Sequence, residues 1–225
     1  MPQLIAMIIV VVAAMIYMFQ TFGGTGDKIE GVAQKGSIIT EINNIKDGVK
    51  IAAKSAHIQT SAGTDPDAAK NLKGLATLSY FAEQINSQLT TSTNANANVY
   101  NAISFGGKSE TTTGTANKSA MKISLVATTV GTTPGLFVDL ADGSLKTNKA
   151  FLEAQIAKDL EAVAYIDRHA VSATAPATVQ NSSGTDLEKR TPGYSTPVTT
   201  TGSESISDGK FIIYFKDFGA DEVIK

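Results

Sequence analysis

Hydrophobic residues are concentrated at the beginning of the chain, where residues 1–26 contain no charged side chain. From Leu4 to Phe22 the apolar run is interrupted only by Gln20 and Thr21. As an α-helix this run would be about 28 Å long, which is enough to cross the hydrocarbon core of a bilayer. The pattern therefore predicts an apolar helix that has to be covered by a membrane or by other protein chains.

The same segment does not follow the pattern of a cleaved secretory signal. Such signals have a positively charged start, an apolar core of about 7–15 residues and small residues at the cleavage site. Here the first residues include no Lys or Arg, and the Ala13-Ala14 pair lies inside the apolar run. We therefore expect the segment to be retained as a membrane or assembly helix, with contacts made by Leu4, Ile5, Ile8, Ile9, Val12, Ile16, Phe19 and Phe22.

Glycines follow the apolar run and weaken the helical pattern. Gly23, Gly24 and Gly26 each disfavour a helix by about 1 kcal/mol relative to alanine. We expect a hinge at this link, and we assign residues 1–26 to the apolar helix together with its glycine-rich link.

Residues 27–60 have the spacing of an amphipathic helix. Apolar residues recur mostly at steps of three or four, with charged residues between them. The charged side chains, Glu41 among them, are expected to face solvent or a partner, and Asp47 is spaced to pair with Lys50. The side chains expected on the buried face are Ile29, Val32, Ile39, Ile42, Ile45, Val49 and Ala52.

The remaining residues, 61–225, combine helical and strand patterns and predict a small globular head. A helix is expected to start at Asp65-Pro66, where an N-cap residue precedes a proline at the first helical position. A second amphipathic helix is expected over Asn148–Ala170. The first of these helices is expected to carry on one face Leu72, Leu75, Leu78, Ala82, Ile85 and Leu89.

Alternating apolar residues predict the strands of the head. Met121–Thr128 and Gly135–Leu140 are expected to be neighbours in an antiparallel sheet, with a short strand in Val99–Phe105 and a strong one at Lys210–Phe218. Between these elements, Val171–Asp208 is rich in Ser, Thr, Pro and Gly and is expected to be a long polar loop. The expected fold class is α+β, with a long apolar and amphipathic N-terminal helix as the spine of a small head of antiparallel sheet and helices.

Composition narrows the function classes. The chain has 19 basic and 21 acidic residues, so no broad cationic surface for nucleic acid is expected. There is no cysteine, which excludes disulfides, zinc ribbons and thiol catalysis.

Candidate chemical motifs are sparse. The S-x-x-K pattern of Ser119 and Lys122 enters a predicted strand, where the two side chains would point to opposite or nearly opposite faces. His57 and His169 are the only histidines and stand far apart in the sequence. The oxygen-rich turn around Asp142 lacks the full ligand pattern of a calcium loop. We therefore expect no catalytic, cofactor-binding or metal site, and a protein that is not an enzyme.

Two Asn-x-Ser sequons are present, at Asn117 and Asn181. They are candidate glycosylation sites in an exported chain, and they predict surface exposure at both positions.

The order of elements resembles that of type IV pilin-like subunits. In this resemblance, Leu4–Phe22 corresponds to the buried half of the pilin spine and Asp27–Gln59 to the half that packs against the head. The segment Gly135–Ser144, GLFVDLADGS, is similar to the strand and loop of pseudopilin heads. The resemblance implies a subunit that waits in the membrane by its N-terminal helix and then assembles with the spines bundled in a filament core.

The chain differs from that family at three features. Ile5 stands where the family usually has a glutamate, the cysteine pair of many pilin heads is absent, and no basic leader with a glycine cleavage site precedes Met1, unless the numbering begins at the mature methionine. These differences concern processing more than packing, because bundling of apolar helices requires only burial and small residues at the contacts.

We therefore expect a structural subunit of an extracellular pilus-like filament, a homopolymer formed through N-terminal helices, located in the inner or cell membrane before assembly. The alternative is a non-polymerising, single-pass, membrane-anchored extracytoplasmic binding protein. An archaeal-type pilin or flagellin is a further alternative, although those heads are mainly β and this one is expected to contain helices.

Overall fold

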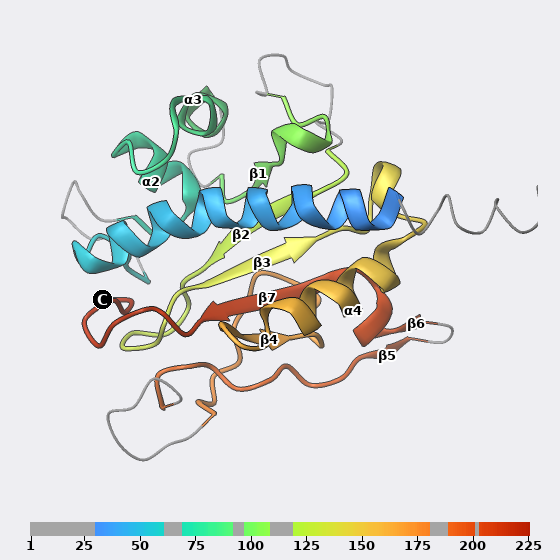
Figure 1. The fold of residues 1–225 in the computed structure, drawn as a ribbon. Coiled ribbons are helices and arrows are strands. Elements are labelled where there is room, and N and C mark those ends of the chain that lie inside the picture. The colour runs from blue at the N-terminus through green and yellow to red at the C-terminus, as the bar shows by residue number, and fades with distance from the viewer. Residues whose placement is uncertain (1–29, 61–68, 92–96, 109–118, 181–188, 201–202) are drawn as a thin grey trace, which may run out of the picture.

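A helix of residues 30–54 lies across one face of an antiparallel sheet (Figure 1). The computed structural model describes residues 30–60, 69–91, 97–108, 119–180, 189–200 and 203–225. The combination of this N-terminal helix, shorter helices and an antiparallel sheet confirms the predicted α+β class.

The elements after the N-terminal helix are short. The helices are α2 (Leu72–Thr77), α3 (Glu83–Thr91) and α4 (Lys149–Leu160), with the 3-10 turns η1 (Ile103–Phe105), η2 (Gly143–Leu145) and η4 (Ser205–Ser207). The strands are β1 (Tyr100–Asn101), β2 (Lys122–Val126), β3 (Gly135–Asp139), β4 (Ala164–Asp167), β5 (Thr199–Thr200), β6 (Ser203–Glu204) and β7 (Lys210–Phe215).

Five strands pair in the order β1-β2-β3-β7-β4, and every neighbouring pair is antiparallel. The predicted pairing of β2 with β3 is confirmed, with Ile123 opposite Val138. The last strand, β7, lies in the interior of the sheet, where Ile213 has Leu136 on one side and Ile166 on the other. A separate two-stranded ladder joins β5 to β6.

Strand β7 is buried on both of its faces, which explains its unbroken apolar sequence. Phe211, Ile213 and Phe215 point into the main core that the N-terminal helix covers. The alternate residues, Ile212 and Tyr214, point to the opposite face and form a second core.

Part of the predicted loop 171–208 covers that opposite face. Ala173 and Ala175 pack against the second core, whose buried members include Ala170. The loop also contains a bridge between Val179 and Pro192 and the short elements β5, β6 and η4. The absence of apolar periodicity therefore did not mean absence of packing, because small side chains cover the sheet here.

The single helix predicted over residues 72–89 is wrong, because the structure has two helices there. Helix α2 ends at Thr77, Ser79 takes a positive φ of 62°, and α3 begins at Glu83. A residue in the left-handed region ends a helix, so the chain changes direction after α2. The N-cap of α2 is Asn71, whose side chain accepts a hydrogen bond from the Gly74 N–H, whereas the predicted cap at Asp65-Pro66 lies outside the described residues.

The helix predicted to extend to Ala170 also ends earlier. Helix α4 stops at Leu160, and four residues later the chain enters β4. Pairing with β7 overrides the helical spacing, because Ile166 gains a strand partner there, whereas Val163 is 50% exposed in the connecting turn.

Side-chain amides cap one edge of the sheet. The buried Gln88 of α3 donates from Nε2 to the Asn101 carbonyl at 2.8 Å and accepts from the Asn101 N–H at 2.9 Å. Asn98 makes the same two-way contact with Leu125 of β2, at 2.7 and 3.2 Å. These amides take the place of a further strand and satisfy backbone groups that an edge strand would leave unpaired.

A buried carboxylate joins α4 to the start of β7. Glu153 is 0% exposed and accepts hydrogen bonds from Arg168 Nε at 2.8 Å and from the Gly209 N–H at 2.9 Å. Arg168 also donates to the carbonyl of Ile206. Burial raises the pKa of Glu153, and the hydrogen bonds from Gly209 and Arg168 oppose this rise without cancelling it.

The raised pKa of Glu153 predicts a pH dependence. The folded protein holds this proton more tightly than the unfolded chain, so the carboxyl contributes most to stability below its ordinary pKa of 4.5, and the contribution is lost as pH rises through the folded pKa. The unfolding free energy of the native chain minus that of Glu153→Gln should therefore decrease from about pH 4 to pH 7. Urea unfolding of the full chain in detergent across this range measures the difference. A difference that grows with pH would show that Arg168, and not burial, dominates.

Candidate functional site

The helix of residues 30–54 follows the segment for which an assembly role was predicted, and its contact with the sheet is extensive. Its buried stripe follows steps of three and four residues through Ile38, Ile42, Ile45, Val49 and Ala52, each at most 1% exposed. These side chains share one core with the inward-facing residues of β2, β3 and β7. Burial of each large aliphatic side chain contributes about 1.5–3 kcal/mol, so this contact is a major part of the core.

The predicted buried face is confirmed in its C-terminal part and wrong at its start. Val32 is 60% exposed, and Ile39 is only partly buried while its neighbour Ile38 is fully buried. The reason is the position of Val32 around the helix. It lies six residues before Ile38, which is a rotation of about 240°, so its side chain is not on the buried stripe. Ile29 lies outside the described residues.

Two glycines of the helix have different surroundings. A Cβ at Gly48 would lie 2.4 Å from Cδ1 of Phe81 and 2.5 Å from the carbonyl oxygen of Tyr80. A Cβ at Gly36 would meet no atom within 4 Å. Gly48 is therefore required by the close approach of the turn after α2, whereas Gly36 has no such packing role.

Ion pairs hold the helix at two places along its length. Lys46 and Lys50 both reach Asp217, just after β7, at 2.8 and 3.1 Å, and Lys46 also lies 4.8 Å from the centre of the Phe215 ring. Nearer the start of the helix, Lys35 pairs with Asp159 of α4 at 2.6 Å. Lys50 thus pairs with Asp217 at the end of the sheet.

The pKa of Asp217 reflects these two lysines. Partial burial alone would raise the pKa, but the hydrogen bonds and charges of Lys46 and Lys50 together outweigh it and lower the pKa below its ordinary value.

The prediction that Glu41 faces solvent or a partner is wrong. Glu41 is buried within the protein, where its carboxylate accepts from the Tyr100 hydroxyl and from the Ser104 N–H, both at 2.8 Å. Burial and the hydrogen bond to Glu41 raise the pKa of Tyr100. The sequence signal was available: Glu41 lies three residues after Ile38 and four before Ile45, on the buried stripe itself.

The predicted assembly residues and the predicted hinge fall outside the part of the chain that the structure describes. This holds for every one of Leu4, Ile5, Ile8, Ile9, Val12, Ile16, Phe19, Phe22, Gly23, Gly24 and Gly26. It also holds for both sequon positions, Asn117 and Asn181. Among the helices that are described, none is both long and apolar enough to cross a membrane.

The structure separates the residues of the S-x-x-K pattern. The Ser119 hydroxyl is buried and donates a hydrogen bond to the Met121 carbonyl at 2.7 Å. Lys122 instead forms an ion pair with Asp142 at the protein surface. The two histidines are not brought together either: His57 contacts the Tyr80 hydroxyl, and His169 follows β4. In the described ranges no group of three or more His, Cys, Asp or Glu residues is arranged to hold a metal ion.

Comparison of the chain with protein-family models, with curated proteins and with solved structures finds no match in any of the three.

The two glycines provide a matched pair of substitutions. Gly48→Ala should lower the free energy of unfolding by about 1–3 kcal/mol, because the added methyl group overlaps Phe81 and the Tyr80 carbonyl. Gly36→Ala should raise it by about 0.5–1 kcal/mol, because alanine favours the helix and meets nothing. Urea unfolding followed by circular dichroism measures both, and changes of the same sign would contradict the packing argument.

Asp217→Asn tests the attachment of the helix to the end of β7. The substitution should lower the free energy of unfolding by about 0.5–1 kcal/mol at pH 7, as is usual for partly exposed ion pairs. The decrease should be smaller in 1 M salt. Because the folded pKa of Asp217 is lowered, its contribution is present above the ordinary value of 3.8 and is lost as pH falls through the folded pKa. The free energies of unfolding of the native chain and the variant should thus become equal in acid. Stability curves that stay parallel down to about pH 2 would exclude an ionic origin.

Proposed function

We propose that this chain is a pilin-like structural subunit of an extracellular helical filament, anchored in the membrane by its N-terminal segment before assembly. The observation that supports this most directly is the order of elements along one continuous chain. A 1–26 segment without charge precedes a helix, residues 30–54, that packs along the sheet of an α+β head.

The attachment of the helix suits a subunit that has to carry load. The buried stripe from Ile38 to Ala52 is about 21 Å long. Ion pairs to Asp159 and Asp217 add contacts near both ends of that stripe. Pulling on the helix along its axis would have to break the whole stripe together, so force applied through the N-terminal segment is passed to the sheet.

The sequence of the N-terminal segment fits both states of such a subunit. Leu, Ile, Phe and Val each favour a membrane by about 0.3–0.6 kcal/mol. The same side chains can pack against copies of themselves, and Ala6, Ala13 and Ala14 permit close approach between helices. The membrane is thus one environment of the segment and the centre of a filament is the other.

Electron microscopy of native cells tests the proposal. Filaments sheared from the source cells should contain this polypeptide by mass spectrometry, and deletion of residues 1–22 should abolish them. The single change Ile9→Asp should do the same, because a carboxylate costs about 3 kcal/mol in the middle of an apolar helix. The control is Val130→Asp, which changes the same kind of side chain at a position that is 62% exposed in the head, and should leave filaments intact.

Two outcomes would overturn the proposal. One is that filaments persist without residues 1–22. The other is that the polypeptide occurs in membranes only as detergent-soluble monomers, which would favour an anchored binding protein.

A further inference from the structure

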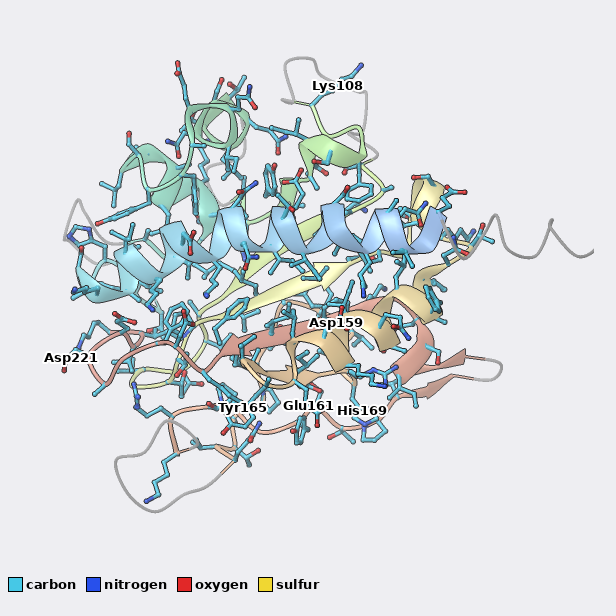
Figure 2. All side chains as sticks on the ribbon, viewed as in Figure 1. Lys108, Asp159, Glu161, Tyr165, His169 and Asp221 are labelled. Carbon is cyan, nitrogen blue, oxygen red and sulfur yellow. The ribbon has the colours of Figure 1, made fainter. Side chains whose placement is uncertain are left out.

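A cavity of about 470 Å³ lies at the β4 edge of the sheet. Its volume falls within the range of about 300–1,000 Å³ that is usual for small-molecule sites. Three parts of the chain form its walls: the last turns of α4, strand β4 and the segment at Tyr194. Figure 2 shows Glu161 and Tyr165 on the same side of the head, and both line the cavity. Exposed side chains border the cavity, so a ligand can reach it from solvent.

Small side chains leave this space and form its apolar bottom. Ala154 and Ala157 line the cavity and are three positions apart, which places them on the same side of α4. Ala164, at the start of β4, also lines it but is only 2% exposed, so this residue lies at the closed inner end. A ligand would therefore meet polar side chains at the rim and an apolar surface at the bottom.

The rim carries more positive than negative charge. Lys158 makes no ion pair or hydrogen bond with any described residue. Lys216 donates to the Glu161 carbonyl at 2.7 Å, which is a neutral acceptor, so no carboxylate of the described chain compensates its charge. Arg168, the third cation, is already paired with the buried Glu153. The charges of two lysines can thus act on an anionic group of a ligand.

One carboxylate shares the rim with these lysines. The side chain of Glu161 accepts no hydrogen bond from the described part of the chain. This carboxylate would repel a ligand of high charge density, such as a polyphosphate, whereas it can accept hydrogen bonds from hydroxyl groups. The rim therefore favours a ligand in which isolated negative charges are separated by hydroxyl groups.

An exposed aromatic ring completes the rim. Tyr194 lines the cavity and is 58% exposed. The next residue, Ser195, is fixed by two hydrogen bonds that its N–H and hydroxyl donate to the buried Asp167. The ring of Tyr165 already has Lys216 at 4.6 Å from its centre, so Tyr194 offers the more accessible ring. Such a ring, apolar with a polar tip, suits a partly wet contact with the CH face of a sugar.

We propose that this cavity binds an acidic saccharide and holds one of its uronate residues. The uronate carboxylate pairs with Lys158 and Lys216, and Glu161 accepts hydrogen bonds from the sugar hydroxyls. The ring of Tyr194 packs against the CH face of the same sugar. This inference goes beyond the filament proposal, because it gives the head a ligand and holds whether or not the chain polymerises.

Calorimetric titration of the full chain with defined ligands tests the inference. The probe is trigalacturonate, and the protein is kept in a detergent without sugar head groups. The first control is the methyl ester of trigalacturonate, which keeps the rings and hydroxyl groups but removes the charge. The second control is tricarballylate, which carries as many carboxylates as trigalacturonate but has no sugar ring.

Trigalacturonate should bind, and both controls should bind at least about tenfold more weakly. Lys158→Glu should weaken binding of trigalacturonate by about tenfold and leave that of the ester unchanged, because only the acid has a charge to repel. Lys54→Glu, the same charge change at an exposed position outside the cavity, should alter neither. Tyr194→Ala should weaken binding by about three- to tenfold, and Tyr194→Phe should retain it.

A fluorescent reporter locates the binding. The chain contains no tryptophan, so Tyr194→Trp introduces a single one at the cavity. Trigalacturonate should shift the emission of this tryptophan at the concentrations at which calorimetry detects binding. Val130→Trp, at a position that is 62% exposed and outside the cavity, should give no shift.

Equal binding of trigalacturonate and its ester would contradict the inference, because the lysines would then not select the ligand. Equal binding of tricarballylate would do the same, because the cavity would then be a general anion site. The assignment to this cavity would be overturned by equal effects of Lys158→Glu and Lys54→Glu, by an emission shift for Val130→Trp alone, or by no binding at millimolar trigalacturonate.

Discussion

The burial of the N-terminal helix against the inner face of the sheet is the contact on which the rest of the structure depends. The residues that it covers come from β2, β3 and β7, which are all distant from the helix in the sequence, and β7 is also distant from the β2–β3 pair. Among the described residues no strand covers that face. The helix covers it together with α4, whose Leu152 and Ile156 belong to the same core, so without the N-terminal helix many of these apolar side chains would be exposed to water. The head and the helix are consequently one folding unit, and the filament proposal needs that unity because the helix carries the apolar segment.

Central placement of β7 imposes a second requirement on the chain. A strand that is apolar on both faces needs two covers, and the second is built from the segment after β4. Its attachment is polar: the buried Asp167 accepts from the N–H of Ser195 at 2.7 Å and from the Ser195 hydroxyl at 2.6 Å. A residue of the edge strand thereby holds the covering chain close to β4.

Local periodicity accounts for what was predictable, and long-range contacts account for what was not. The helix after residue 27, the β2–β3 pair and the β7 strand each have a strong period of their own. The early ends of α2 and α4 depend on distant partners, since Phe81 packs on Gly48 and β4 pairs with β7. The amides of Gln88 and Asn98 gave no signal at all, because a polar residue reveals a capping role only when the strand beside it is known.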